Sequence, residues 1–399
     1  MQSIKQIYKI GTGPSSSHTM GPQKAALMFK DRNSTADIFK VTLYGSLAAT
    51  GKGHLTDAAI LNALGAVETE IIWKPETVLK FHPNGMYFEA YKDGELLDSW
   101  TVYSIGGGDL ATEESRIGSD ISSDVVYPMS TMSEVLEYCK QTGKTFWEYV
   151  EDIEGPKIWD FLTEVWSVME TGIKRGLEAE GLLPGGLLLQ RKASAYYTKG
   201  KSYHKSLSNK AFIYAYALAT SEENAGGGLI VTAPTCGSSG VLPAVLYHLR
   251  TQHDFRESKI IRALATAALI GNIVKENASV SGAEVGCQGE VGVACAMAAA
   301  AATQLFGGSI SQIEYAAEMG LEHHLGLTCD PICGLVQVPC IERNAFAAVR
   351  ALDACTFAML SDGRHLVAFD KVVRTMKETG HDLPSLYRET SLGGLAKNV

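Results

Sequence analysis

The spacing of hydrophobic and polar residues changes near residue 155. Before that point apolar residues come in short runs: DIFKVTLYGSL at 37–47 predicts a strand, and TDAAILNALG at 56–65 predicts a helix. Apolar and polar residues alternate on both sides of Asp93-Gly94 in MYFEAYKDGELLDSWTVYS, which predicts a β-hairpin. After residue 155 apolar positions recur every three or four residues over long segments, and this period predicts helices.

This pattern predicts an α+β fold, with an N-terminal α/β domain over residues 1–150 followed by an all-α domain over residues 151–399. The linker between them is expected within 125–155, where Pro128 interrupts the pattern. Two alanine-rich apolar stretches, 263–274 and 291–306, are too short to span a membrane, so we expect them to be buried helices of a soluble core.

Composition narrows the class of protein. Hydrophobic residues make up 46% of the chain and charged residues 20%, which are ordinary values for a globular protein. The formal net charge of −9 argues against nucleic acid or an anionic membrane as a partner. The N-terminus has no apolar segment followed by a small-residue cleavage site, so we expect a cytoplasmic protein with reduced cysteines.

Three of the eight cysteines lie in segments rich in glycine and proline. Cys287 lies in GAEVGCQGEVG, and Cys329 and Cys340 lie in GLTCDPICGLVQVPCIERN. In a reducing compartment such a group favours a metal or iron–sulfur site over a disulfide. Within the second segment, Cys329, Cys333 and Cys340 follow the spacing C-x3-C-x6-C, which is neither that of a zinc ribbon nor that of a ferredoxin. Three thiolates on a four-iron cluster would leave one iron free to bind substrate as a Lewis acid.

The remaining cysteines are expected to have no role in a metal site. Cys295 and Cys355 lie in alanine-rich helical patterns and are assigned to core packing, since free cysteine is commonly buried. Cys139 is expected to be an ordinary helix residue. Cys236, in TAPTCGSSG, has no base at a recognisable spacing and is expected to be a loop residue.

Two glycine- and serine-rich segments are candidates for anion binding. GTGPSSSHTMGP, at 11–22, lacks the third glycine of a dinucleotide fingerprint and the GK[ST] of a P-loop, so its serines either cap a helix or contact a ligand. LIVTAPTCGSSGVLPAVLYHL, at 229–249, predicts a short extended run, a turn and a helix from near Val241. We expect the backbone N–H groups of Ser238, Ser239 and Gly240 to face an anion there.

Several long motifs resemble the iron–sulfur-dependent bacterial L-serine dehydratases, in their single-chain form. They are IGTGPSSSHTMGP, LYGSLAATGKGH, NAGGGLIVTAPTCGSSGVLPAVL, GAEVGCQGEVGVACAMAAAA and GLTCDPICGLVQVPCIERNA, and the resemblance runs from about residue 3 to residue 396. It implies a chain that fuses a β-type domain to an α-type catalytic domain. It also implies a [4Fe–4S] cluster and conversion of L-serine to pyruvate and ammonia.

The resemblance assigns roles to particular residues. By motif position the cluster ligands are Cys287, Cys329 and Cys340, and Cys333 is left out because relatives tend to carry a small residue there. His54, in GKGHLTD, is the first candidate for the base that removes the Cα proton, although it could instead be a helix N-terminal residue. His18 is expected to orient the substrate. Because both histidines precede residue 150, the site is expected between the domains.

Other side chains are expected around the substrate. Its carboxylate is assigned to serine, threonine and glycine residues of the two glycine- and serine-rich segments: Ser16, Ser17, Thr235, Ser238, Ser239 and Gly240. Asn224, Arg343 and Asn344 are weaker candidates, and of the adjacent His323 and His324 at most one is expected to face the cluster. No cysteine follows Cys355, so we expect an open or water-ligated fourth iron in the resting enzyme.

Three alternatives remain open from the sequence. The same cluster could eliminate sulfide from L-cysteine, or act on threonine. A pyridoxal-phosphate lyase would use the GSSG turn for the cofactor phosphate and Lys275 for a Schiff base. A non-catalytic protein would sense oxygen through the cluster or bind serine. Family habit and exposed domain faces further predict a homodimer.

Overall fold

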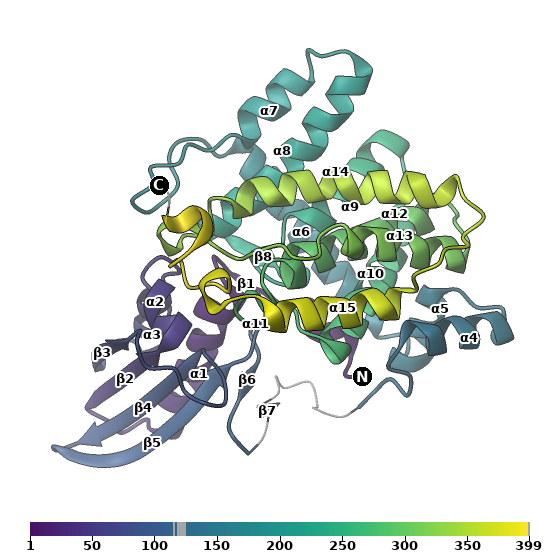
Figure 1. The fold of residues 1–399 in the computed structure, drawn as a ribbon. Coiled ribbons are helices and arrows are strands. Elements are labelled where there is room, and N and C mark those ends of the chain that lie inside the picture. The colour runs from purple at the N-terminus through teal and green to yellow at the C-terminus, as the bar shows by residue number, and fades with distance from the viewer. Residues whose placement is uncertain (115, 118–124, 398–399) are drawn as a thin grey trace.

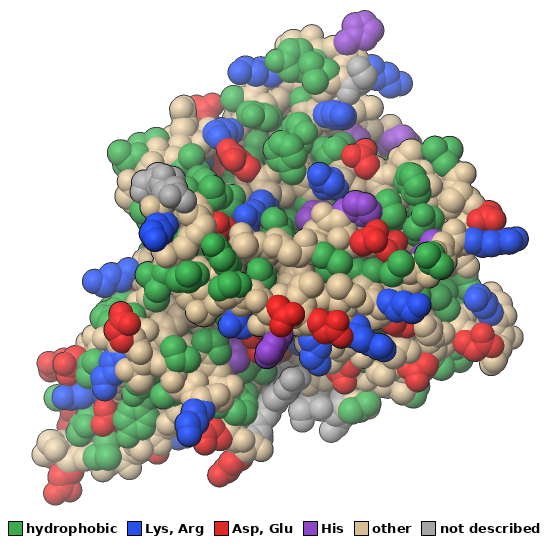
Figure 2. Space-filling view, in the orientation of Figure 1, with side chains coloured by type: hydrophobic (Ala, Val, Ile, Leu, Met, Phe, Trp, Pro, Cys, Tyr) green, Lys and Arg blue, Asp and Glu red, His purple; other side chains and the backbone are tan. Residues whose placement is uncertain are grey.

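The computed structural model describes residues 1–114, 116–117 and 125–397. Figure 1 shows a twisted sheet with short helices beside a larger helical body, and the C-terminal segment lies where the two meet. This arrangement confirms the predicted α+β class. The face drawn in Figure 2 carries acidic and basic side chains interspersed with apolar ones.

Eight strands form two sheets in the described chain. They are β1 (Ile10–Thr12), β2 (Ile38–Tyr44), β3 (Glu68–Lys74), β4 (Gly85–Lys92), β5 (Glu95–Ser104), β6 (Leu110–Ala111), β7 (Arg116–Ile117) and β8 (Leu229–Val231). Six form one sheet in the order β3-β2-β4-β5-β6-β7, in which only β2 and β3 pair in parallel. A parallel pair needs a crossover, and the chain between β2 and β3 supplies it as two short helices.

The sheet domain has its own hydrophobic core. Its helices are α1 (Gly21–Arg32), α2 (Gly45–Thr50) and α3 (Thr56–Leu64), preceded by a π-helical turn, η2 (Ser16–Met20). Phe39, Val41 and Leu43 alternate along β2 and are fully buried against Phe29 of α1 and Phe88 of β4. Alternation on β2 therefore gives the buried face that the sequence predicts.

The helical body contains twelve α-helices in the described residues. They are α4 (Met132–Thr142), α5 (Phe146–Glu154), α6 (Ile158–Glu178), α7 (Ala193–Gly200), α8 (Lys205–Ala225), α9 (Val241–His253), α10 (Glu257–Asn277), α11 (Gly282–Val285), α12 (Val293–Leu305), α13 (Ile310–Glu322), α14 (Cys340–Met359) and α15 (Phe369–Asp382). Short turns are η1 (Ile4–Gln6), η3 (Gln288–Gly292), η4 (Ile332–Gly334), η5 (Ser385–Tyr387) and η6 (Gly394–Lys397). Among the described helices none is long and apolar enough to cross a membrane.

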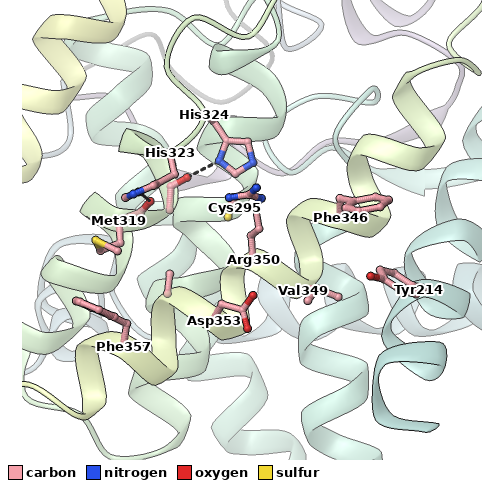
Figure 3. A pocket seen from close by; sticks show the side chains of 12 residues that line it. Tyr214, Cys295, Met319, His323, His324, Phe346, Val349, Arg350, Asp353 and Phe357 are labelled. Carbon is pink, nitrogen blue, oxygen red and sulfur yellow. Dashed lines mark hydrogen bonds between the residues drawn. The ribbon is translucent and has the colours of Figure 1, made fainter. Parts of the chain in front are cut away.

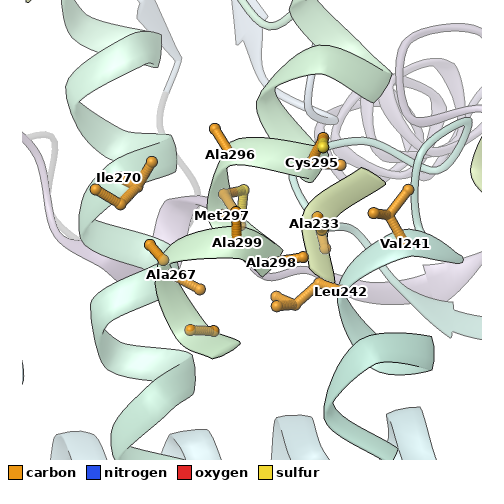
Figure 4. Close-up of a cluster of buried hydrophobic side chains, with 14 of the residues drawn as sticks. Ala233, Val241, Leu242, Ala267, Ile270, Cys295, Ala296, Met297, Ala298 and Ala299 are labelled. Atoms are coloured by element: carbon orange, nitrogen blue, oxygen red, sulfur yellow. The ribbon is translucent and has the colours of Figure 1, made fainter. Parts of the chain in front are cut away.

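Helix α12 lies at the centre of this body. Its alanines are fully buried and pack against residues such as Ala267 and Ile270 of α10 and Leu242 of α9 (Figure 4). Small side chains let the helices approach closely: a Cβ on Gly320 of α13 would lie 2.9 Å from the backbone nitrogen of Ala296. Close packing of this kind fixes the position of η3, the turn that leads into α12.

The segments that precede and follow the sheet domain along the chain both pack with the helical body. Strand β1 pairs with β8, which lies 221 positions further along the chain at the Ile10–Val231 register, and the Met1 ammonium donates to the carbonyl of Tyr127 at 2.8 Å. The core of the sheet domain draws on residues 25–110, whereas that of the helical body draws on residues 1–8 and 127–376. Helices α4 and α5 thus pack with the helical body, and a domain boundary at residue 150 stays a prediction.

The local predictions agree with the observed elements. The expected strand, helix and hairpin of the first domain are β2, α3 and the β4–β5 pair, with Asp93 and Gly94 at φ of 51° and 86° in the turn. The alanine-rich stretches fall in α10 and in η3 with α12, and the run-turn-helix around the GSSG motif is β8 followed by α9.

Candidate active site

The three cysteines of the glycine- and proline-rich segments meet on one side of the helical body. Cys287 lies between α11 and η3, Cys329 follows α13, and Cys340 is the first residue of α14. All three are buried. The sulfurs of Cys287 and Cys329 and a carboxylate oxygen of Glu290 lie within 4.8 Å of one another, and Cys340 is near enough for the Cys287 thiolate to affect its pKa.

The charge environment favours a thiolate in this group. The hydrogen bond from Cys329, and then the Arg343 guanidinium, lower the pKa of Cys287 to about 6. Hydrogen bonding to Cys287 raises the pKa of Cys329, and burial raises the pKa of Cys340. Negative charge is therefore favoured on Cys287 over Cys329 and Cys340, and a bound metal would favour loss of the protons of all three.

The donor set fits an iron–sulfur cluster. Thiolates are the usual ligands of such clusters, and three buried cysteines leave one iron position for another donor. Cys333, which the sequence excluded, is exposed and sits on η4 with a φ of 55°. Cys139, Cys236, Cys295 and Cys355 are all buried among other side chains.

The two histidines singled out in the sequence lie together in the sheet domain. Both are fully buried, and their ring centroids are 4.5 Å apart. His18 lies in η2, where Ser15 caps the turn by accepting from the His18 amide at 3.0 Å, and His54 lies in the turn between α2 and α3. The helix-cap role considered for the serine run thus falls to Ser15, which leaves Ser16 and Ser17 beside the histidine.

Both ring nitrogens of His18 have partners. Its Nε2 lies 3.0 Å from the Ser46 hydroxyl, which donates onward to the carbonyl of Glu389 at 2.8 Å. Because the Ser46 proton is used in that bond, Ser46 accepts from Nε2–H, and Nδ1 accepts from the Ser17 hydroxyl at 2.9 Å. These contacts fix His18 as the neutral Nε2–H tautomer.

His54 differs because neither ring nitrogen has a hydrogen-bond partner among the described residues. Burial lowers its pKa to about 3, so the imidazole is neutral and one of its ring nitrogens carries no proton. A buried polar atom without a partner is costly and commonly marks a site that a ligand completes. The His54 backbone is held by the Thr19 hydroxyl, which donates to its carbonyl at 2.7 Å.

The GSSG turn contributes hydroxyls, but its amides are occupied. The Ser239 N–H donates to the carbonyl of Cys236 at 3.1 Å, and the Gly240 N–H donates to Oδ1 of Asn344 at 2.9 Å. The expectation that these amides face an anion is therefore wrong for Ser239 and Gly240, because the tight turn and α14 use these two donors. For the Ser238 amide it stays a prediction. Ser238 bonds to the Thr235 hydroxyl at 3.1 Å, while the buried Ser239 hydroxyl has no partner within the described chain.

Asn224, like Ser239, has one buried polar atom without a partner among the described residues. Its amide donates to the carbonyl of Pro14 at 2.8 Å, and its Oδ1 is buried without a partner in the residues described. Asn344 is committed to the turn, since its Nδ2 also donates to the carbonyl of Gly237 at 2.7 Å. Arg343 donates to the carbonyl of Thr328 at 2.6 Å. Of the three weaker candidates, Asn224 alone thus keeps an unpartnered polar atom.

Three residues of this region were missed by the sequence reasoning. Glu290 accepts from the Thr235 hydroxyl at 2.7 Å, and burial raises its pKa to about 8. Glu389 lies in the C-terminal segment with Oε1 3.5 Å from Nδ1 of His18. Ser46 connects the His18 ring to the backbone carbonyl of Glu389. Glu290 lies three positions after Cys287, a helical spacing that could have placed it there, whereas nothing local distinguishes Glu389 or Ser46.

The C-terminal segment joins the histidines to the cysteines. The Cys329 N–H donates to the carbonyl of Tyr387, and the Glu389 N–H donates to the carbonyl of Cys329, both at 2.8 Å. The negative charges of Glu290 and Cys287 raise the pKa of the Glu389 carboxyl, after burial as the main cause. Two segments from different domains and the C-terminal segment therefore enclose one polar site.

A metal ion could also be considered for His18, His54 and Glu389, whose donor atoms lie within 4.8 Å of one another. His18, however, uses both ring nitrogens in hydrogen bonds to serines. Of the three residues, only His54 and Glu389 have buried donor atoms without a hydrogen-bond partner in the described chain. Two free donors are too few for a tightly held transition metal, so this trio fits a ligand better than an ion.

Two further groups considered in the sequence lie elsewhere. His323 and His324 border a cavity of about 410 Å³ with Tyr214, Phe346 and Arg350, and each Nδ1 contacts a backbone carbonyl of α13 (Figure 3). None of the candidate cluster ligands lines that cavity. Lys275 is paired with Asp109 at 2.6 Å, and a second half-buried lysine, Lys9, contacts the same carboxylate.

Comparison with known proteins places this geometry in a family. Residues 111–396 match the family model described as the serine dehydratase alpha chain, and residues 3–72 and 63–115 match that of the serine dehydratase beta chain. The chain is 42% identical to the L-serine dehydratase of Streptomyces coelicolor and to L-serine dehydratase TdcG of Escherichia coli, in each case over 100% of this chain and 99% of the relative. It is 37% identical to the L-serine dehydratase of Helicobacter pylori over the same shares. The chain therefore belongs to the serine dehydratase family, with the beta-type and alpha-type parts in one polypeptide.

Proposed function

We propose that this protein is an L-serine dehydratase that converts L-serine to pyruvate and ammonia. The similarity to proteins of that name extends over the full length of both chains. The observation that carries the proposal at the level of residues is His54, a buried and unpartnered imidazole in a site shared with the three cysteines. β-Elimination begins with removal of the proton on Cα, which requires a base, and a neutral histidine without a protein partner can serve as that base.

The residues that would hold the cofactor are Cys287, Cys329 and Cys340. A [4Fe–4S] cluster bound by them would supply a Lewis acid that assists departure of the serine hydroxyl. The Arg343 guanidinium stabilises negative charge on Cys287. Thr235 holds the Glu290 carboxylate in place beside the ligands.

The histidines would act on the other end of the substrate. His54 takes the Cα proton, and the imidazolium that results lies within 4.8 Å of the Glu389 carboxylate, which stabilises its charge. His18, held by Ser17 and Ser46, presents a fixed ring against His54. The substrate carboxylate is assigned to Ser16, Ser17 and Ser239, which are buried, and the Ser239 hydroxyl has no partner among the described residues.

The overall reaction balances without a further reactant. Loss of the Cα proton to His54 and of hydroxide from Cβ gives 2-aminoacrylate and water. This enamine tautomerises to an imine, and water hydrolyses the imine to pyruvate and ammonia. No oxidant or reductant is consumed, so the cluster keeps its redox state through the cycle.

The alternatives are disfavoured by particular contacts. A pyridoxal-phosphate reaction would need a free amine, and Lys275 is bound to a buried carboxylate that it shares with Lys9. L-cysteine and L-threonine also carry a leaving group on Cβ, so the test includes all three amino acids. The homodimer and the cytoplasmic location stay predictions.

The test measures pyruvate from L-serine with anaerobically purified protein reconstituted with iron and sulfide. We expect turnover without added pyridoxal phosphate, and loss of turnover together with the visible cluster spectrum after brief exposure to air. L-cysteine and L-threonine are assayed in parallel. An intact cluster with no 2-oxoacid from L-serine would overturn the proposal, and sulfide release from L-cysteine would then identify the activity.

A further inference from the structure

We infer that Glu389 binds the α-ammonium group of the substrate, an inference that rests on the proposed function. The roles proposed so far leave the substrate ammonium without a partner. Glu389 lies in the C-terminal segment, 6% exposed, and its Oε2 is buried with no hydrogen-bond partner among the described residues. A buried carboxylate oxygen without a partner needs one, and a ligand with an N–H donor would satisfy it.

The charges around Glu389 call for a cation. In the described chain His18 is the only basic side chain within 4.0 Å of its carboxylate, and His18 is held neutral by Ser17 and Ser46. An ammonium group placed here would therefore meet the Glu389 carboxyl without a competing cation, and its positive charge would favour the ionised form of that carboxyl.

The position of Glu389 suits an amino acid bound by its Cα substituents. A ring nitrogen of His54 lies within 4.8 Å of a Glu389 oxygen. Two acceptors that contact neighbouring substituents of one tetrahedral carbon lie about 4–6 Å apart at hydrogen-bond distances. With the Cα proton at His54 and the ammonium at Glu389, the Cβ hydroxyl can point toward the cysteines. These contacts would thus select one configuration of the substrate at Cα.

The backbone of Glu389 is held firmly enough for this role. Its N–H and carbonyl are both bonded, to the Cys329 carbonyl at 2.8 Å and the Ser46 hydroxyl at 2.8 Å. Its φ of 57° lies in the left-handed region, which a non-glycine residue adopts only when its surroundings enforce it. Farther along, Leu395 and Ser391 anchor the segment to Asp330 and Pro331 at 2.7 Å each. These bonds aim the carboxylate into the site.

The test compares L-serine with glycerate, in which a hydroxyl replaces the ammonium. Holoenzyme variants Glu389→Gln and Glu389→Asp are prepared anaerobically, with Glu342→Gln as a control because Glu342 is an exposed residue of α14. Binding is followed by the change that each ligand causes in the electron paramagnetic resonance spectrum of the reduced cluster. Iron and sulfide content is measured in every sample.

We expect Glu389→Gln to weaken L-serine binding about 10- to 100-fold, the usual worth of a hydrogen bond to a charged group, and to change glycerate binding less than about threefold. Glu389→Asp should keep part of the preference for L-serine over glycerate. If Glu389→Gln loses its cluster, the same comparison of the two ligands is made with Glu389→Asp. Equal losses for both ligands, or a lower kcat with unchanged L-serine binding, would overturn the inference. Wild-type protein that binds L-serine but forms no pyruvate would instead overturn the proposed function, because the binding comparison does not depend on turnover.

Discussion

Replacing His54 by leucine is expected to stabilise the protein while removing its activity. His54 is fully buried, and both ring nitrogens lack partners among the described residues. Leaving a buried polar group unsatisfied costs about 1–3 kcal/mol, and leucine has similar size with no polar atom. Loss of a general base lowers kcat by about 10²- to 10⁴-fold. The same side chain thus lowers stability and supplies the chemistry.

The gain in unfolding free energy of the His54→Leu variant over the wild type should grow as the pH falls. The folded-state pKa of His54 is lowered by burial from 6.5 to about 3, so below about pH 6.5 the unfolded chain takes up a proton that the folded chain refuses. Stability from the neutral imidazole is therefore complete above the unfolded pKa and is lost as the pH falls toward 3. Between pH 7 and pH 5 this linkage costs the wild type about 2 kcal/mol, and the leucine variant escapes that cost.

The assay is urea unfolding of anaerobic, cluster-loaded protein at about pH 7 and pH 5, with pyruvate formation measured on the same samples. His248→Leu is the matched control, because His248 is buried in α9 with Nδ1 unpartnered and burial lowers its pKa to about 4. At the lower pH both variants should be more stable than the wild type by a larger margin than at pH 7, and only His54→Leu should lose turnover. A destabilised His54→Leu protein, or one that still makes pyruvate, would refute the reasoning.

Two other substitutions test the surroundings of the site. Cys340→Ser should abolish turnover and lower the iron and sulfide content, whereas Cys333→Ser, at an exposed position, should retain both; equal losses in the two variants would contradict the ligand assignment. Ser46→Ala removes the hydroxyl that connects His18 to the Glu389 carbonyl, at a cost of about 1–3 kcal/mol in lost hydrogen bonding. Turnover should fall about 10- to 100-fold through kcat with iron content and KM preserved, and an unchanged kcat would show that His18 needs no such support.

Local patterns in the sequence predicted the elements that depend on neighbouring residues. Alternation gave β2, a two-residue turn at Asp93-Gly94 gave the hairpin, and the helical period gave the alanine-rich α12. The pairing of β1 with β8 could not be predicted, because each strand has three residues and their partners are more than 200 positions away. Such a pairing depends on the packed helices around it and leaves no periodic signal.

The candidate site shows the same division. The cysteines and His54 stand in long glycine-rich motifs that resemble a known family, so they could be named from the sequence. Glu389 could not, since an acidic residue near a chain end usually indicates a solvated surface. Only the folded chain reveals that its carboxylate is buried beside His18. The occupied amides of Ser239 and Gly240 are likewise a consequence of tertiary contacts.

Backbone contacts between the domains position His54, the proposed base, relative to the proposed cluster ligands. Gly53, next to His54, packs so closely on η4 that a Cβ there would lie 2.6 Å from the carbonyl oxygen of Gly334. On the other side of the site, the Cys329 backbone holds the segment of Glu389. Elimination needs the base and the leaving-group acceptor to act on adjacent carbons, and errors of about 1 Å in such positioning cost about 10²-fold in rate. Contacts between backbones change less with side-chain motion than contacts between long side chains, which explains why a site built from three separate segments can still be precise.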